Sequence, residues 1–359
     1  DYSPYARNRT EDLDKFCKKN DITFICKEDH VLYDILEGQT LKKDKTPYTV
    51  FTPFKNYCQK NLKVPSPNNQ RKISFKKYPE LKTMKIYEKD IDQYYEPNPD
   101  INVHGGRTLG LNILKKIDHF HNYDKERDTF MYSTTFLAAH NHFGTVSIRE
   151  VYEACKQNSS LVNELHWRDF YYNLFHTHPY MLGGQIGDIN KPFKERFEKI
   201  KWSYDKKLFK KWCDGTLGIP VCDAGMRQLN KTGFMHNRLR MITSGVLSKL
   251  CHIPWWWGEQ YFATKLVDYD SIQNAGGWGW GCHGIDPQQL FRIFSPQLQG
   301  ERYDPECIYI KKYIPELKDV PNKDIHEWET AHEKYDVYYP PAIDYSKSRK
   351  ETLEMLKKL

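Results

Sequence analysis

The chain has 359 residues, of which 54 are Lys or Arg and 47 are Asp or Glu, so its formal net charge is +7. No stretch approaches the roughly 18 consecutive apolar residues that a spanning helix needs, which excludes a helical membrane protein. The first residues lack the charged and then apolar order of a signal peptide, so we expect an intracellular protein of the cytoplasm or nucleus. A positive charge of this size permits a polyanionic partner but does not require one.

The N-terminal segment predicts one helix followed by one strand. The helix is expected over residues 9–20, and the strand over the apolar residues 22–26. Because one helix and one strand cannot bury a sheet, we interpret residues 1–58 as the end of a doubly wound α/β domain. The remaining strands of that domain would be missing or would belong to a separate chain.

Prolines interrupt the segment that follows. Five of them break every candidate helix between residues 60 and 100, where Lys, Asn and Tyr are also frequent. We therefore predict that residues 59–120 form a linker.

The rest of the sequence predicts helices. Ser147, followed three residues later by Glu150, has the pattern of a capping box, and Gly233 is typical of a helix end. Helices are expected over residues 149–175, 223–231, 235–250 and 259–267. Because convincing alternating strands are absent after residue 60, residues 121–359 are predicted to form a helical domain, and the fold class is mainly α.

The common phosphate and metal motifs are absent or misplaced. There is no GxGxxG and no GxxxxGK, so neither a dinucleotide fold nor a P-loop is indicated. His326 and His332 resemble the pair of a zinc protease helix but have the wrong spacing. Asp268 and Asp270 flank Tyr269, and two such carboxylates more often cap a helix than bind a metal ion. We predict no metal site.

A glycine-rich segment sets two large rings apart from their neighbours. Trp278 and Trp280 lie among four glycines in residues 276–281, which lets other groups approach the backbone closely. An aromatic turn packed on the core is one explanation. A ring presented to a flat ligand is the other.

Two predicted helices each place a polar side chain beside an aromatic or methionine side chain. Glu164, Trp167 and Tyr171 share one face of a predicted helix, although a plain surface pair of Glu164 with Arg168 is also possible. Asn237 lies one turn before Met241 at a predicted helix start. Its amide could read the edge of a base, or it could cap the helix.

Four blocks of sequence carry a family resemblance. They are ELHWRDFYYNLF at residues 164–175, the segment from WCDG to VLSK at 212–249, NAGGWGWG at 274–281 and FRIFSPQLQGERYDPE at 291–306. From about residue 123 to 359, and more loosely from 1 to 54, the chain resembles the class I cyclobutane pyrimidine dimer photolyases of the photolyase/cryptochrome family.

The resemblance implies a helical domain that binds FAD in a folded conformation. It leaves open the binding of an antenna chromophore, a folate or deazaflavin, because only the end of the α/β domain is expected. Ala138 replaces a serine that is usual in the family. The positions that match the family's flavin site are Tyr123, Thr134, Thr135, Leu137, Ala138, Arg240, Asp268, Tyr269, Asp270 and Asn274.

The implied activity is light-driven repair of UV-damaged DNA, in which an excited reduced flavin donates an electron to a flipped-out pyrimidine dimer. Glu164 and Asn274 match catalytic positions. Trp202, Trp255 and Trp278 match the family's electron-transfer chain, and the run Trp255, Trp256, Trp257 offers an alternative path. The positions that match the lesion pocket are Glu164, Trp167, Tyr171, Asn237, Arg238, Met241 and Trp280.

Two other functions fit the same resemblance. One is a cryptochrome-like flavin photoreceptor that repairs nothing, and the other is an inactive or split photolyase remnant. Asn274 favours repair, because photolyases tend to keep asparagine at this position and plant cryptochromes do not.

Overall fold

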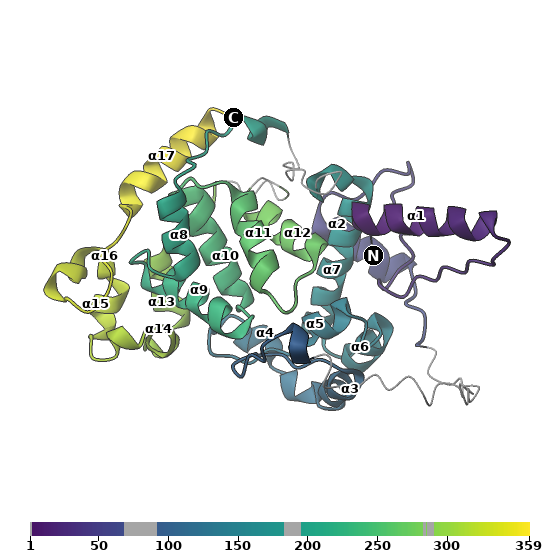
Figure 1. Cartoon of the computed structure of the whole chain (residues 1–359), viewed down its shortest axis with the longest axis horizontal. Coiled ribbons are helices and arrows are strands. Elements are labelled where there is room, and N and C mark those ends of the chain that lie inside the picture. The colour runs from purple at the N-terminus through teal and green to yellow at the C-terminus, as the bar shows by residue number, and fades with distance from the viewer. Residues whose placement is uncertain (1, 68–91, 183–194, 283–284, 286–290) are drawn as a thin grey trace.

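The computed structural model describes residues 2–67, 92–182, 195–282, 285 and 291–359 (Figure 1). These residues form a helical protein, and among them no strand is present. The α-helices are α1 (Pro4–Lys19), α2 (Phe51–Asn61), α3 (Arg107–Lys115), α4 (Tyr123–Glu126), α5 (Leu137–His142), α6 (Ile148–Cys155), α7 (Ser159–Thr177), α8 (Lys206–Asp214), α9 (Pro220–Thr232), α10 (Asn237–Gly245), α11 (Trp255–Lys265), α12 (Ser271–Cys282), α13 (Pro296–Tyr303), α14 (Ile308–Tyr313), α15 (Asn322–His326), α16 (Trp328–Ala331) and α17 (Tyr345–Lys357).

The predicted N-terminal helix forms, but the strand after it does not. Helix α1 starts earlier than expected, because Ser3 caps it and Pro4 occupies its first turn. Residues 22–26 have no strand conformation, so that prediction is wrong. A strand needs a neighbouring backbone to satisfy its hydrogen bonds, and the described chain supplies none here. Ile22 and Ile25 are accordingly exposed.

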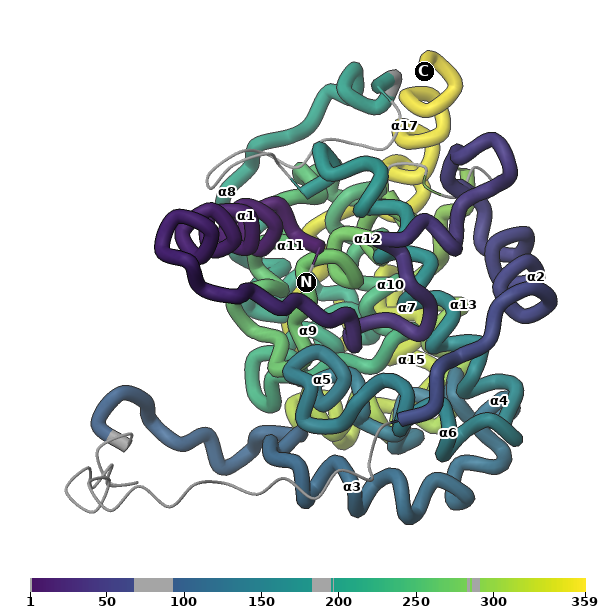
Figure 2. Tube along the Cα trace, turned by 90° about the vertical axis from the view of Figure 1, so that its right-hand side faces the viewer, coloured from purple at the N-terminus to yellow at the C-terminus, as the bar shows by residue number. Residues whose placement is uncertain are grey.

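The N-terminal segment returns to the helical body after α1. Figure 2 shows it running across the body from α1 to α2. Val31, Leu32 and Tyr33 are buried in the same core as Phe54 of α2. Part of the predicted linker, residues 68–91, lies outside the described residues, and α3, within the rest of it, packs against α5 and α6.

Side-chain caps set the helix boundaries around α7. The capping box of Ser147 and Glu150 starts α6 as predicted. The single helix expected over residues 149–175 is wrong, because the Asn158 side chain accepts hydrogen bonds from the backbone N–H groups of Ser160 and Leu161 and starts a second helix. Asparagine competes well for such a position.

The remaining predicted helices are present with shifted ends. Helix α9 ends at Gly233, whose positive φ of 66° suits glycine. Helix α10 continues into a π-helical turn, Val246–Leu250, and α11 begins earlier than predicted, at Trp255.

Helix α12 lies between two hydrophobic cores. Its Trp278 belongs to a core with Trp212 and Phe262, whereas its Ile272 belongs to a core with Phe170. Figure 1 shows α12 between α11 and α7. Both cores therefore fix the position of this one helix.

Within the described ranges, the helices are too short or too polar to cross a bilayer.

Gly258 tests the packing of α11 on α12. A Cβ at this position would overlap the Trp278 ring and lie 2.5 Å from a methyl group of Leu247. Gly258→Ala should therefore destabilise the protein by about 1–3 kcal/mol, the usual cost of overpacking a core. Denaturant unfolding measures this change. Gly245→Ala is the matched control, because a Cβ there meets nothing within 4 Å, and equal stability of the two variants would contradict the packing.

Candidate functional site

The predicted face of α7 is formed, but its ion pair has a different partner. Glu164 pairs with Arg127, which follows α4, at 2.5 Å. Arg168 is only 8% exposed and donates to the backbone carbonyl of His30. The alternative of a surface pair between Glu164 and Arg168 is therefore wrong. Trp167 and Tyr171, half-buried, complete the face with their rings 5.8 Å apart.

Two opposing effects act on the Glu164 carboxyl. Desolvation raises its pKa, while the Arg127 cation lowers it, and the net direction is upward. A raised pKa increases the fraction of carboxyl that can donate a hydrogen bond.

Helices α7 and α12 touch at Gly276. A Cβ at this residue would lie 2.6 Å from the Tyr171 ring, so only glycine allows the observed approach. Trp278, two residues on, is 3% exposed and packs edge-on to Phe262 at 5.3 Å. Trp280 is half-buried on the same helix. The helix that carries the GGWGWG segment thus packs on α7 at Tyr171.

The start of α10 excludes the capping role for Asn237. The helix is capped by His236, whose Nδ1 accepts from the backbone N–H of Arg238 at 3.1 Å. Asn237 is exposed and is not the cap, and Met241 lies one turn further. Arg238 pairs with Asp128 at 2.5 Å.

The start of α12 is fixed by Asp270. One carboxylate oxygen accepts from the backbone N–H groups of Ile272 and Gln273, and the other accepts from Tyr172 and from His142. Burial alone would raise the pKa of Asp270, but these hydrogen bonds and a nearby arginine lower it below its usual range. The predicted cap is confirmed for this carboxylate.

Glu259 of α11 organises two predicted cofactor residues, although no sequence motif indicated it. The Asn274 side-chain amide donates to the Glu259 carbonyl at 3.1 Å and to its carboxylate at 2.9 Å. The Tyr269 hydroxyl donates to the same carboxylate at 3.4 Å. On the adjoining α10, Arg240 holds Asp268 through two contacts of 2.8 and 3.1 Å.

Residues 134–138, which contain four of the predicted flavin-site positions, lead into α5. Leu137 donates its backbone N–H to the Thr135 hydroxyl at 3.3 Å, and Thr134 is half-buried, whereas Ala138 is exposed. Upstream, Tyr123 lies at the start of α4 with the Arg127 guanidinium 5.9 Å from its ring centre.

Two buried polar atoms beside this stretch lack a partner. The Tyr132 hydroxyl and the Asn141 side-chain carbonyl make no hydrogen bond within the described residues. Because buried polar groups are normally satisfied, such atoms suit a site that takes a polar ligand. The donors and acceptors on α5, α10 and α12 therefore fit a flavin nucleotide.

An additional ring, Trp256, contacts two members of the predicted tryptophan chain. Trp256 contacts Trp202 edge-on at 5.9 Å and Trp255 at 5.9 Å. Trp255 is 1% exposed. The path between the predicted members Trp202 and Trp255 can therefore run through Trp256, a residue that the sequence offered only as an alternative.

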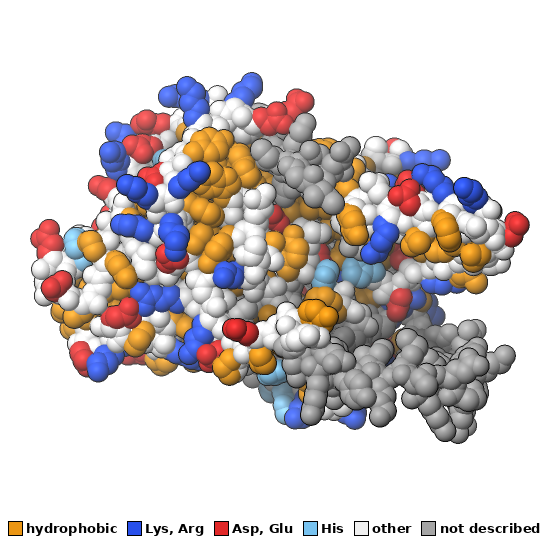
Figure 3. All heavy atoms as spheres, in the orientation of Figure 1, with side chains coloured by type: hydrophobic (Ala, Val, Ile, Leu, Met, Phe, Trp, Pro, Cys, Tyr) orange, Lys and Arg blue, Asp and Glu red, His pale blue; other side chains and the backbone are white. Residues whose placement is uncertain are grey.

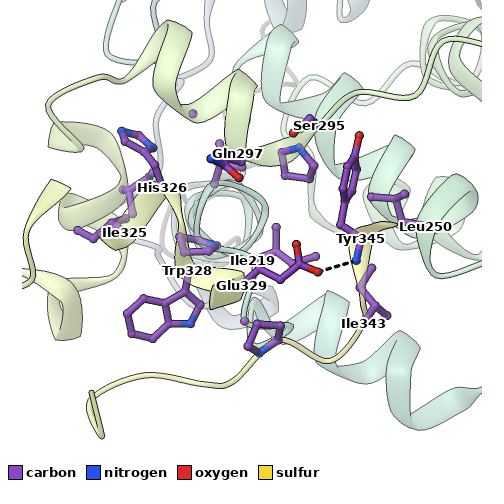
Figure 4. Close-up of a pocket in the computed structure, with 17 residues that line it drawn as sticks. Ile219, Leu250, Ser295, Gln297, Ile325, His326, Trp328, Glu329, Ile343 and Tyr345 are labelled. Atoms are coloured by element: carbon purple, nitrogen blue, oxygen red, sulfur yellow. Dashed lines mark hydrogen bonds between the residues drawn. The ribbon is translucent and has the colours of Figure 1, made fainter. Parts of the chain in front are cut away.

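A separate cavity lies among the C-terminal helices. It has a volume of about 110 Å³, and none of the predicted site residues lines it. Figure 4 shows Ile219, Leu250 and Ile343 around it, with His326 at its edge.

Two protein families match this sequence. Residues 161–358 match the family described as the FAD binding domain of DNA photolyase, and residues 1–71 match the family described as DNA photolyase.

Individual relatives agree with these matches. The chain is 34% identical to the deoxyribodipyrimidine photo-lyase of Alkalihalophilus pseudofirmus, over 98% of this chain and 76% of the relative. The structure of an archaeal photolyase from Sulfolobus tokodaii with two FAD molecules matches at a TM-score of 0.85 and 33% identity, over 100% of this chain and 77% of that one. The cryptochrome of Synechocystis sp. PCC6803, at a TM-score of 0.76 and 24% identity, shares the fold.

The fold and the flavin-binding match define a flavoprotein with the photolyase/cryptochrome architecture. More specifically, the chain belongs to the DNA photolyase family, and its cofactor is FAD.

Replacing Arg127 tests the electrostatics at Glu164. Arg127→Gln removes the cation that lowers the pKa of Glu164, so the carboxyl should stay protonated to a higher pH than in the parent. An infrared titration measures this pKa through the carboxyl band that Glu164→Gln abolishes. Arg107→Gln, which breaks the ion pair with Glu150 instead, should leave the band unchanged. An unchanged or lowered pKa in Arg127→Gln would contradict the assigned ion pair.

Proposed function

We propose that this protein is a class I photolyase, which repairs UV-damaged DNA by splitting cyclobutane pyrimidine dimers in light. The observation that carries the proposal is the contact of α7 and α12 at Gly276, which brings Glu164, Trp167 and Tyr171 beside the helix of Trp280. Such a mixture of flat rings and one carboxyl suits a base taken out of its stack.

Stacking of the lesion on aromatic rings supplies the binding energy in this proposal. Trp167 and Trp280 would each hold the lesion through ring contact worth about 1–3 kcal/mol per base. Extrusion of a base costs a few kcal/mol, and less at a damaged site that is already poorly paired. Stacking on two rings can therefore offset the free-energy cost of flipping out a dimer. Flipping out an intact base pair costs more, so the same two rings would favour it less.

Polar groups would orient the dimer. A protonated Glu164 can donate a hydrogen bond to a carbonyl on the dimer's edge and stabilise negative charge that develops there, and its raised pKa supports this role. Asn237, exposed and not needed as a cap, can read the other edge, with Met241 one turn further along the same helix. Arg238 would position this helix start through Asp128.

The proposed cofactor site lies on α5, α10 and α12. Asn274 would face the flavin ring, with its amide direction fixed by Glu259. Arg240 with Asp268, and Tyr269 with Asp270, would line the ring and ribose, while Tyr123 and residues 134–138 would hold the phosphates. FAD in its reduced state supplies the light-excited electron for ring opening. This chemistry requires no general base or protein nucleophile.

We extend the proposal to the tryptophan chain. Electrons would enter at Trp202 and pass through Trp256 to Trp255 and then Trp278, with a thiol in solution replacing the electron lost from Trp202. The edge-on contacts of Trp256 with both neighbours support this order.

Trp256→Phe tests the route. Because a phenylalanine ring is much harder to oxidise than an indole, the variant should bleach the oxidised-flavin absorption several-fold more slowly under blue light with a thiol present. Trp257→Phe is the control, because Trp257 packs against Phe209 and Tyr204 instead. Equal bleaching rates in the parent and Trp256→Phe would remove Trp256 from the path.

An apolar surface on α1 supports a proposal about the α/β domain. Tyr5 is 61% exposed, Leu13 46% and Phe16 58%, and Figure 3 shows hydrophobic side chains along this helix, on the right. We propose that this surface and residues 22–26 pack against further strands, which a separate chain would supply. The domain limits at residues 58 and 120, and the binding of a folate or deazaflavin antenna, belong to the same proposal.

Since the proposed substrate is genomic DNA, we also propose that the protein works inside the cell, in the cytoplasm or nucleus.

One experiment separates the candidate functions. The purified chain is reduced, mixed with irradiated DNA and exposed to blue light, while dimers and the flavin spectrum are followed, with a dark sample as control. Light-dependent loss of dimers is expected. Bound, photoreducible flavin without repair would favour a photoreceptor. No bound flavin would indicate an inactive remnant, unless co-expression with the proposed partner chain restores it.

A further inference from the structure

Phe51, the first residue of α2, lies flat against Trp167. The two ring centres are 3.7 Å apart and the ring planes differ by 6°. This is a full stacking contact, so one face of the Trp167 indole is covered by another ring. No motif in the sequence connected α2 with the lesion pocket.

Phe51 is held in place by the core. It meets Phe170 edge-on at 5.9 Å, and Phe170 also meets Trp167 edge-on at 5.8 Å, so the three rings form a closed group. Phe54, one turn along α2, is fully buried against Phe170 at 5.6 Å. A ring packed in this way keeps a fixed orientation. It is not free to rotate into the space that a bound base would occupy.

Tyr171, one turn along α7, connects Trp167 to α12. The Trp167 ring is tilted by 35° to that of Tyr171, and Tyr171 in turn touches Gly276. The order of contacts is therefore Phe51, Trp167, Tyr171 and then the helix of Trp280.

We propose that Phe51 is a positioning residue for lesion recognition: it covers one face of Trp167 and holds the indole plane so that the opposite face takes the flipped-out pyrimidine dimer. This inference rests on the proposed function, because it requires that Trp167 contacts a lesion. It places α2, which precedes the predicted linker, among the elements that set the shape of the pocket.

The test compares binding of a duplex containing one thymine dimer with binding of the same undamaged duplex. Phe51→Ala should weaken binding of the damaged duplex by about 2- to 12-fold, the range that an aromatic pair contributes. Binding of the undamaged duplex, which does not use Trp167, should be unchanged. Phe16→Ala on α1, which removes an exposed ring, should change neither.

Conservative variants and a double variant distinguish a positioning role of Phe51 from a loss of folding. Phe51→Tyr keeps the flat ring and should bind like the parent. Phe51→Leu keeps apolar volume but no ring plane, and should lose affinity even if Phe51→Ala fails to fold. In a Trp167→Ala background, Phe51→Ala should cost no further affinity, because Phe51 acts through that indole.

The outcomes distinguish this inference from the proposed function. If the parent does not prefer the damaged duplex, the proposed function is wrong. If the parent prefers it but Phe51→Leu binds equally well, or if the losses from Phe51→Ala and Trp167→Ala add in full, the positioning role alone is wrong.

Discussion

The contact between α7 and α12 at Gly276 is the constraint on which the proposed site depends. A side chain at this residue would enter the Tyr171 ring, 2.6 Å from the nearest ring atom. With hydrogen alone, the two helices approach closely enough for the Glu164 face of α7 to meet the helix that carries Trp278 and Trp280. The proposed lesion pocket and the proposed flavin site therefore both include residues of α12, Trp280 in the first and Asn274 in the second.

The same helix is tied to the N-terminal segment by a buried polar network. Asp270 caps α12 and accepts from Tyr172, whose hydroxyl also lies 2.5 Å from His30 Nε2. Arg168 donates to the His30 carbonyl and lies 4.7 Å from the Tyr172 ring centre. Since breaking one member would leave buried polar groups unpaired, the network fixes α12 against both α7 and residue 30. The helical body and the N-terminal segment are therefore not independent of each other.

Local signals in the sequence predicted local structure well. The capping box of Ser147 and the end of α9 at Gly233 follow from backbone chemistry within a few residues and are confirmed. The strand over residues 22–26 failed because strand formation depends on partners that its own sequence does not contain. The pair of Glu164 with Arg127 joins residues 37 apart, so no spacing rule along α7 could reveal it. The resemblance supplied the remaining site residues, but not the contacts of Phe51, Trp256 or Glu259. Those of Phe51 and Glu259 arise from packing between helices, and that of Trp256 with Trp202 arises from packing of a helix on a loop.

The most direct test of this account is Gly276→Ala, compared with Gly277→Ala at the next position. A Cβ at residue 277 meets nothing within 4 Å, so the two variants differ only in whether α7 and α12 are forced apart. Gly276→Ala should lose at least about tenfold in affinity for dimer-containing DNA while its helical circular dichroism is retained, and Gly277→Ala should bind like the parent. A tenfold loss corresponds to about 1.4 kcal/mol. Parent-like binding by Gly276→Ala would contradict the central claim that this contact assembles the site.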